Sequence, residues 1–192
     1  MAAPIDFYFD FSSPYGYLAA EKIEPFAAKH GRAVTWRPTL LGAVFKVTGG
    51  KPLPEWPLKG DYSKHDMQRS ARFHNVPFHL PAAFPVGTVS ACRAFYSLAD
   101  EKDRVKLAKA LYRAYFIENV NIGEADNVLR VAASLGFKPD LSDSSLKEKT
   151  KSEVETSIAR GVFGSPYFIV DGEPFWGIDR FDQLERWLAK PF

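Results

Sequence analysis

The chain has 192 residues, of which 46% are hydrophobic and 25% charged, and its formal net charge at pH 7 is +2. This length is sufficient to bury a substantial core in one or two domains, and the apolar fraction is ordinary for a globular protein. The small net charge gives no reason to expect a nucleic-acid or membrane-surface partner, and no stretch is long and apolar enough to span a bilayer.

The first predicted element is a strand over residues 5–11, where apolar residues alternate with others. Because this strand begins so close to the N-terminus, we expect no signal peptide. Ser13-Pro14-Tyr15-Gly16 follows the strand and precedes a predicted helix over residues 17–23. Ser13 is expected to be the N-cap of that helix, with Pro14 in its first turn. Taken alone, a serine and a proline at such a junction are more often structural than catalytic.

The middle of the chain is predicted to be mostly helical. Prolines punctuate residues 51–60 and 77–85, so loops are expected there. Gly136 and Gly161 are expected to end two of the helices. The predicted helices cover residues 61–73, 89–99, 103–116, 125–135 and 144–160.

Cys92 is the only cysteine, so an intramolecular disulfide is excluded and a reducing, cytoplasmic location is expected. It lies in a predicted helix, where we expect a small buried hydrophobic residue rather than a reactive thiol. His65, His74 and His79 lie close together in the sequence, but their spacing matches no common metal motif. We therefore predict no metal site.

The C-terminal segment begins with a turn and a strand over residues 162–170, with Pro166 at the start of the strand. Asp171-Gly172 is a tight-turn signal, and residues 174–177 form a second predicted strand. The two ends of the chain thus predict a β-α-β unit and a β-β-α unit. The last predicted helix covers residues 180–190, and its apolar face comprises Phe181, Leu184, Trp187 and Leu188.

Three motifs carry a family resemblance: residues 9–15, 161–166 and 176–180. In this order, with a long segment between the first and second, they resemble 2-hydroxychromene-2-carboxylate isomerases. That family is allied to kappa-class glutathione transferases in the DsbA-like branch of thioredoxin folds. The resemblance implies an α/β, thioredoxin-like fold with a large all-helical insertion, in a homodimer. Residues 1–40 and 162–192 would form the discontinuous thioredoxin-like domain, and residues 41–161 the helical insertion.

The resemblance places Ser13 and Gly16 where thioredoxin-like proteins carry the two cysteines of Cys-X-X-Cys. A hydroxyl cannot exchange disulfides, but it can donate a hydrogen bond to the thiolate of a ligand, and glutathione is the expected ligand. The hydroxyl and the helix N-terminus would both lower the pKa of that thiol. Ser12 is an alternative donor; Ser13 is preferred because it precedes Pro14.

The resemblance also implies how the rest of glutathione is held. Ser165 would pair with the cysteinyl part through its backbone, next to Pro166, which is expected to be cis; the alternative for Pro166 is a proline that simply starts a strand. The γ-glutamyl end would meet Trp176, Gly177, Ile178 and Asp179, although kappa-class transferases carry Ser where Ile178 stands. Asp179 is alternatively an ordinary helix N-cap.

The second substrate is expected between the two halves of the protein. The resemblance assigns its carboxylate to Lys46, for which a solvated surface lysine is an equal alternative. Phe84, Leu53 and Pro54 are expected to be wall or lid residues. The family often has Asn after the glycine of the following loop, and Gly49-Gly50 stands there instead. Lys59, Asp61 and Tyr62 are other polar candidates near this loop.

The resemblance implies a glutathione-dependent cis/trans isomerase of aromatic, naphthalene-type catabolism. It would interconvert 2-hydroxychromene-2-carboxylate and trans-o-hydroxybenzylidenepyruvate, with glutathione as a regenerated cofactor. Two alternatives stay open at this point. One is a kappa-like glutathione transferase that keeps the thioether product, and the other is a redox-dead thioredoxin-like binding or chaperone module.

Overall fold

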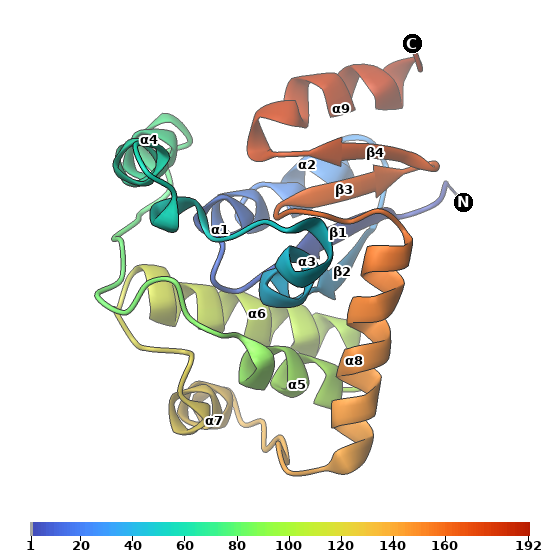
Figure 1. Ribbon diagram of the computed structural model, residues 1–192. Coiled ribbons are helices and arrows are strands. Elements are labelled where there is room, and N and C mark those ends of the chain that lie inside the picture. The colour runs from blue at the N-terminus through green and yellow to red at the C-terminus, as the bar shows by residue number, and fades with distance from the viewer. Residues whose placement is uncertain (1) are drawn as a thin grey trace.

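The computed structural model describes residues 2–192 and contains one sheet with strands in the order β2-β1-β3-β4 (Figure 1). β1 and β2 pair in parallel, whereas β3 runs antiparallel to β1 and to β4. The two ends of the chain therefore build the same sheet, which confirms the predicted α/β, thioredoxin-like architecture. The strands are β1 Ile5–Phe9, β2 Val34–Pro38, β3 Tyr167–Val170 and β4 Glu173–Trp176.

The helices surround this sheet, with α9 on one side of it in Figure 1, α5, α6 and α7 on the other, and α8 alongside. The middle helices begin and end close to the predicted residues, and Gly136 and Gly161 follow two of them with positive φ. Over the described residues, no helix has the length and hydropathy that a membrane crossing requires. The helices are α1 Pro14–Ala20, α2 Ile23–Lys29, α3 Leu41–Thr48, α4 Lys59–Phe73, α5 Val89–Ser97, α6 Glu101–Phe116, α7 Ala125–Ser134, α8 Ser144–Ala159 and α9 Phe181–Ala189, with 3-10 turns η1 Leu53–Glu55 and η2 Ile178–Arg180.

Some element boundaries differ from the prediction. β1 ends at Phe9 rather than at residue 11, because the chain turns there. The N–H of Ser13 donates a hydrogen bond of 2.9 Å to the carbonyl of Asp10 within this turn. Phe11 is nevertheless fully buried, so the alternation of apolar residues in the sequence continues past the end of the strand. The predicted loop over residues 51–60 is also not wholly irregular, since it contains η1 and the first residues of α4.

Aromatic side chains from several elements pack around β1 and fix its position. The rings of Phe7 and Phe9 stack with centroids 5.1 Å apart, and Phe7 stacks on Phe168 of β3 at 5.4 Å. Tyr112 of α6 covers Phe9, and Phe181 of α9 meets Phe168 edge-on. Such rings bury large apolar areas, so the end of β1 is held rigidly. The opposite face carries a smaller buried cluster of Tyr8, Val162, Tyr167 and Ile169.

The helices from α3 to α8 come from the chain between the two strand pairs. This arrangement is compatible with an insertion over residues 41–161. The division of the chain into residues 1–40 with 162–192 and residues 41–161 stays a prediction.

Candidate active site

Ser13 lies at the junction between β1 and α1 and is 94% buried, since only 6% of its surface is exposed. It is the N-cap of α1: its Oγ accepts the N–H of Gly16 at 3.0 Å, and Pro14 is the first helical residue. The predicted cap is therefore confirmed. The local sequence suffices for this geometry, because a serine oxygen replaces the missing partner of a first-turn N–H and a proline has no N–H to satisfy.

Ser165 faces Ser13 from the other end of the chain. The Ser13 hydroxyl donates a hydrogen bond of 3.0 Å to the carbonyl of Ser165. The Ser165-Pro166 peptide bond is cis, as expected. Among the described residues, the N–H of Ser165 donates to no backbone or side-chain acceptor. An extended peptide ligand could therefore pair with this backbone.

Gly16 occupies a position with no room for a side chain. A Cβ placed there would lie 2.6 Å from Oγ of Ser165 and 3.0 Å from the hydroxyl of Tyr112. Both distances are below normal contact, so the side chains of Ser165 and Tyr112 fill the volume that a second cysteine would need. The start of α1 therefore presents the hydroxyl of Ser13 and holds no cysteine.

Ser12, the alternative donor, performs a different task in the structure. Its Oγ accepts the N–H of Val86 at 3.0 Å, and the hydroxyl of Tyr115 donates to the carbonyl of Ala83 at 2.7 Å. The first hydrogen bond holds the loop that contains Phe84 against the Ser12–Ser13 turn, and the second ties the same loop to α6. Phe84 itself is partly buried against the core, so the structure brings this predicted wall residue near the turn.

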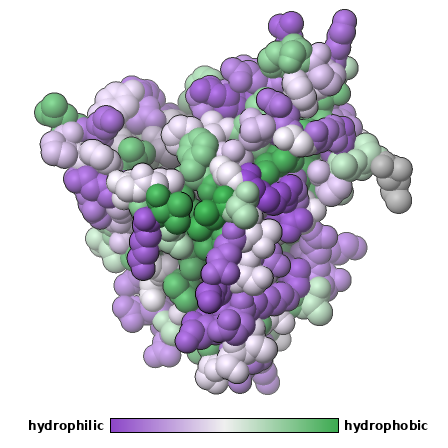
Figure 2. Space-filling model, turned by 45° about the vertical axis from the view of Figure 1, so that its right-hand side comes forward, coloured by the Kyte–Doolittle hydropathy of each residue, from purple (hydrophilic) through white to green (hydrophobic). Residues whose placement is uncertain are grey.

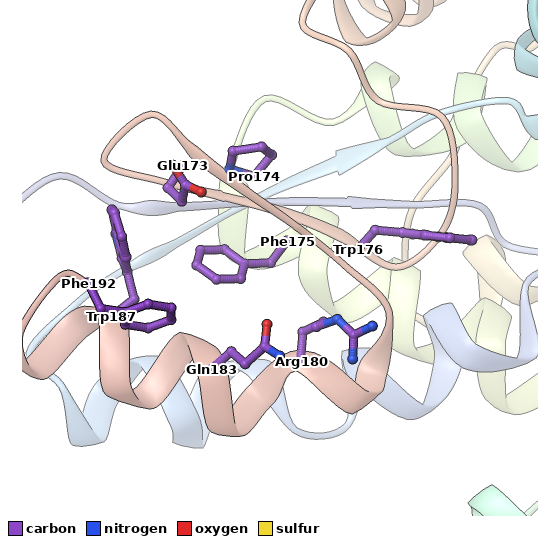
Figure 3. Close-up of a pocket in the computed structure, with 8 residues that line it drawn as sticks. All are labelled: Glu173, Pro174, Phe175, Trp176, Arg180, Gln183, Trp187 and Phe192. Carbon is purple, nitrogen blue, oxygen red and sulfur yellow. The ribbon is translucent and has the colours of Figure 1, made fainter.

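The predicted γ-glutamyl contacts lie on η2 and the end of β4. The N–H of Gly177 donates to the carbonyl of Pro166 at 3.0 Å, so this segment is tied directly to the loop of Ser165. Ile178 is buried in the core, whereas Trp176 is 53% exposed and packs edge-on against Phe163. In Figure 3, Trp176 stands at one end of a groove between β4 and α9. The groove is lined by Glu173, Pro174, Phe175, Trp176, Arg180, Gln183, Trp187 and Phe192.

The alternative role of Asp179 as a helix N-cap is wrong. Asp179 lies inside η2, the N-cap position of α9 is Arg180, and no side chain caps that helix. The reason is the conformation of Gly177, whose φ of 110° turns the chain into a 3-10 segment before α9 begins. The Asp179 side chain is 69% exposed, and its Oδ2 accepts from Arg180 at 2.7 Å. Its carboxylate is therefore accessible to a ligand.

The predicted residues for the second substrate are brought together only in part. The N–H of Leu41, the first residue of α3, donates to the Asp10 carboxylate at 2.8 Å, which ties the helix of Lys46 to the turn before Ser13. Lys46 is exposed and forms no ion pair with another described residue. Leu53 and Pro54 lie in η1, which packs against the start of α4, and no hydrogen bond of the described chain joins η1 to Ser13.

Cys92 is excluded as the source of a nucleophile. It is fully buried in α5, and its sulfur donates a weak hydrogen bond of 3.8 Å to the carbonyl of Thr39. Burial raises the pKa of its thiol well above the ordinary value, so the thiol stays protonated. The predicted role as a small buried residue is confirmed. Within residues 2–192, no three His, Cys, Asp or Glu side chains gather in a way that could hold a metal ion.

Sequence reasoning missed several polar residues that build the site, among them Asp10 and Tyr112. The hydroxyl of Tyr112 donates to the carbonyl of Asp10 at 3.0 Å and borders Gly16. A signal for Asp10 was present, since it is a charged residue between two phenylalanines at the end of the predicted strand. Nothing in the sequence near Tyr112 connects it with residues so far away.

Residues 4–189 match the family described as DSBA-like thioredoxin domain. A 2-hydroxychromene-2-carboxylate isomerase from Sphingobium xenophagum is 30% identical, with 98% of this chain and 99% of that protein covered. Glutathione S-transferase kappa 1 from Caenorhabditis elegans is 27% identical, with 97% and 91% covered. A solved structure of a 2-hydroxychromene-2-carboxylate isomerase matches with a TM-score of 0.86 at 27% identity and covers 97% of this chain and 94% of its own.

The fold and the site thus define a DsbA-like member of the thioredoxin superfamily in which Ser13 and Gly16, and no cysteine, stand at the start of the first helix. Its serine caps the first helix beside a cis-proline loop. The chain belongs to the DSBA-like thioredoxin domain family and, within it, to the family of 2-hydroxychromene-2-carboxylate isomerases. It is an enzyme of the isomerase class.

Proposed function

We propose that this enzyme uses glutathione to interconvert 2-hydroxychromene-2-carboxylate and trans-o-hydroxybenzylidenepyruvate. The observation that carries the proposal is the hydroxyl of Ser13, which lies at the start of α1 and 3.0 Å from the carbonyl of Ser165. With no cysteine available at this point, the nucleophilic sulfur has to come from a ligand. The similarity to isomerases and to a kappa-class glutathione transferase supports both the reaction and the ligand.

The donor set of the site fits a thiol-containing tripeptide. Ser13 offers a hydroxyl for the sulfur, and Ser165 offers a backbone N–H without a partner among the described residues. Asp179 offers an exposed carboxylate for an amine at the far end of the ligand. The thiol, the cysteinyl backbone and the γ-glutamyl amine of glutathione would each meet a partner of the opposite hydrogen-bonding or charge type in this arrangement.

When bound, glutathione supplies a thiolate that makes a conjugated double bond of the substrate temporarily single and so free to rotate. Ser13 stabilises the anionic sulfur by redirecting its proton from the carbonyl of Ser165 to the sulfur. The N-terminal turn of α1 adds partial positive charge on the same side. Both effects favour the charged form of the thiol and lower its pKa.

We infer that the aromatic carboxylate lies against α3 and the loop of Phe84. Lys46 would pair with its carboxylate, and Phe84, Leu53 and Pro54 would provide apolar walls. Hydrophobic side chains gather in a hollow near the middle of the face shown in Figure 2, with hydrophilic side chains around them. An aromatic ring is stabilised by a surface of this kind. We also propose that the enzyme acts as a cytoplasmic homodimer.

A second candidate is a kappa-like glutathione transferase, which the 27% identity to glutathione S-transferase kappa 1 supports. The two reactions share the same first chemical event and differ in whether the sulfur leaves again. Lys46 and the loop of Phe84 hold the substrate in both cases, so the site residues named here serve either outcome.

The deciding experiment follows the ultraviolet absorbance of 2-hydroxychromene-2-carboxylate with and without glutathione and analyses the products by mass. Glutathione-dependent formation of the trans isomer, with no stable conjugate, supports the isomerase. A stable conjugate supports the transferase. If neither product forms, both enzymatic proposals are overturned and a binding module is favoured.

A further inference from the structure

Asp10 is a buried carboxylate immediately before the Ser12–Ser13 turn, with 4% of its surface exposed. Its Oδ1 accepts the N–H of Ser12 at 2.8 Å and the hydroxyl of Thr88 at 3.0 Å. Its Oδ2 accepts the N–H of Leu41 at 2.8 Å. One side chain thus ties together the end of β1, the start of α3 and the residue before α5.

The backbone of Asp10 contacts both residues on which the proposed chemistry depends. Its N–H donates to the side-chain oxygen of Ser165 at 3.0 Å. Its carbonyl accepts the N–H of Ser13 at 2.9 Å and the hydroxyl of Tyr112 at 3.0 Å. A displacement of Asp10 would therefore move Ser13 and Ser165 together.

The carboxylate of Asp10 has no cationic partner: no Lys, Arg or His of the described chain forms an ion pair with it. Its titratable neighbours are Cys92, Tyr112 and Tyr115, and the negative charge of Asp10 contributes to the raised pKa of each. Burial raises the pKa of Asp10 itself, and the three donated hydrogen bonds oppose that rise. A buried acid without a counterion is costly to folding, and the hydrogen bonds that Asp10 makes to the Ser12–Ser13 turn point to a task in the site.

We propose that Asp10 is a positioning residue that aims the hydroxyl of Ser13 and the backbone of Ser165 at the sulfur of the bound thiol tripeptide. This inference rests on the proposed function. It assigns Asp10 no contact with the substrate or with glutathione. Its effect passes through the hydrogen bonds that fix the turn of residues 10–13.

The test is Asp10→Asn, with the pKa of bound glutathione measured from thiolate absorbance and turnover measured at saturating glutathione. An asparagine keeps the shape but has one oxygen, so its amide would face the N–H of Ser12 or of Leu41, donor against donor. The turn should shift, and the weaker hydrogen bond from Ser13 should raise the thiol pKa by about one pH unit and lower turnover about tenfold. The glutathione dissociation constant should change by less than about threefold, because the contacts at the γ-glutamyl end remain.

The direction of the thiol pKa separates positioning from a simple charge effect. If Asp10 acted only through its charge, removing that charge would lower the thiol pKa, since a like charge disfavours the thiolate. An unchanged or lowered thiol pKa overturns the proposal. In a Ser13→Ala background, the part of the Asp10→Asn effect that passes through the Ser13 hydroxyl should be lost, so the rise in thiol pKa should be much smaller; an undiminished effect there also overturns the proposal.

Two further variants complete the design. Asp6→Asn removes another carboxylate from β1, one that pairs with Arg37 and Arg160 away from the turn, and should leave the thiol pKa unchanged. Thr88→Val removes a single hydrogen bond to Asp10 and should raise the thiol pKa by a smaller amount, which carries the test if Asp10→Asn does not fold. Wild-type protein that binds no glutathione in the same assay would instead overturn the proposed function.

Discussion

The hydroxyl of Ser13 donates to the carbonyl of Ser165 across 3.0 Å, although the two residues are 152 positions apart in the sequence. This hydrogen bond joins the cap of α1 to the cis-proline loop and gives the Ser13 proton an acceptor within the protein. A thiolate at the same place would compete for that proton. The Ser13 hydroxyl is thus already oriented close to the direction of the proposed sulfur. Little reorganisation is needed when its proton changes acceptor from the Ser165 carbonyl to the thiolate.

Ser13→Ala should lower glutathione-dependent turnover by roughly one to two orders of magnitude, since a hydrogen bond to a charged group contributes about 1.5–3 kcal/mol. Loss of the cap and of the bond to Ser165 should reduce the free energy of unfolding by about 1–2 kcal/mol. Steady-state kinetics and urea unfolding measure the two effects separately.

Ser12→Ala is the matched control for Ser13, because Ser12 is the neighbouring buried serine and its oxygen accepts from Val86. It should affect the loop of Phe84, and hence the Michaelis constant for the aromatic substrate, more than the pKa of bound glutathione. If Ser12→Ala abolished turnover while Ser13→Ala did not, the donor would be Ser12.

Gly16 should tolerate alanine only when Ser165 is made smaller. A Cβ at position 16 would lie 2.6 Å from Oγ of Ser165, so Gly16→Ala should destabilise the protein by about 1–3 kcal/mol. In a Ser165→Ala background that cost should fall by about 1 kcal/mol or more, as a double-mutant cycle on urea unfolding would report. Equal costs in both backgrounds would show that Tyr112 or the backbone, rather than Ser165, limits the space.

The sequence predicted those features of the site that depend on neighbours along the chain. Ser13 and Pro14 start a helix through local hydrogen bonding and a fixed φ, so their roles followed from residue type alone. The role of Asp10 could not be predicted, because its partners Leu41 and Thr88 reach it only through the tertiary fold. The same holds for the space around Gly16, which depends on α6 and on the cis-proline loop.

Asp179 shows how a local rule can give the wrong geometry. An aspartate just before a helical pattern is a common N-cap, yet the positive φ of Gly177 inserts η2 ahead of α9. The carboxylate is left on the surface beside Arg180 instead of bonding to the backbone of α9. The sequence placed Asp179 at the start of a helical pattern, but it did not show which conformation the turn would adopt.

Cys92→Ala should retain glutathione-dependent turnover, because burial raises the pKa of the thiol and keeps it protonated and inaccessible. The lost packing should reduce the free energy of unfolding by about 1 kcal/mol. Thiol-labelling of the wild type should proceed only on unfolding, which gives an independent check of burial. Loss of turnover in a folded Cys92→Ala protein would mean that the sulfur does not come from glutathione alone.

Asp179→Asn should weaken glutathione binding by about 1 kcal/mol, or roughly fivefold. The carboxylate is proposed to pair with the γ-glutamyl amine, and its 69% exposure limits the strength of that pair in water. Helix stability should change little, because Asp179 does not cap α9. Saturating glutathione should restore most of the turnover, since the reacting sulfur lies at the Ser13 end of the tripeptide.

Calorimetric titration of glutathione measures the affinity, with Asp182→Asn as a control that removes the same charge from the exposed first turn of α9. Equal affinity in the wild type and both variants would leave the γ-glutamyl end without a partner in Asp179, whereas an equal loss in both variants would indicate long-range charge rather than a pair.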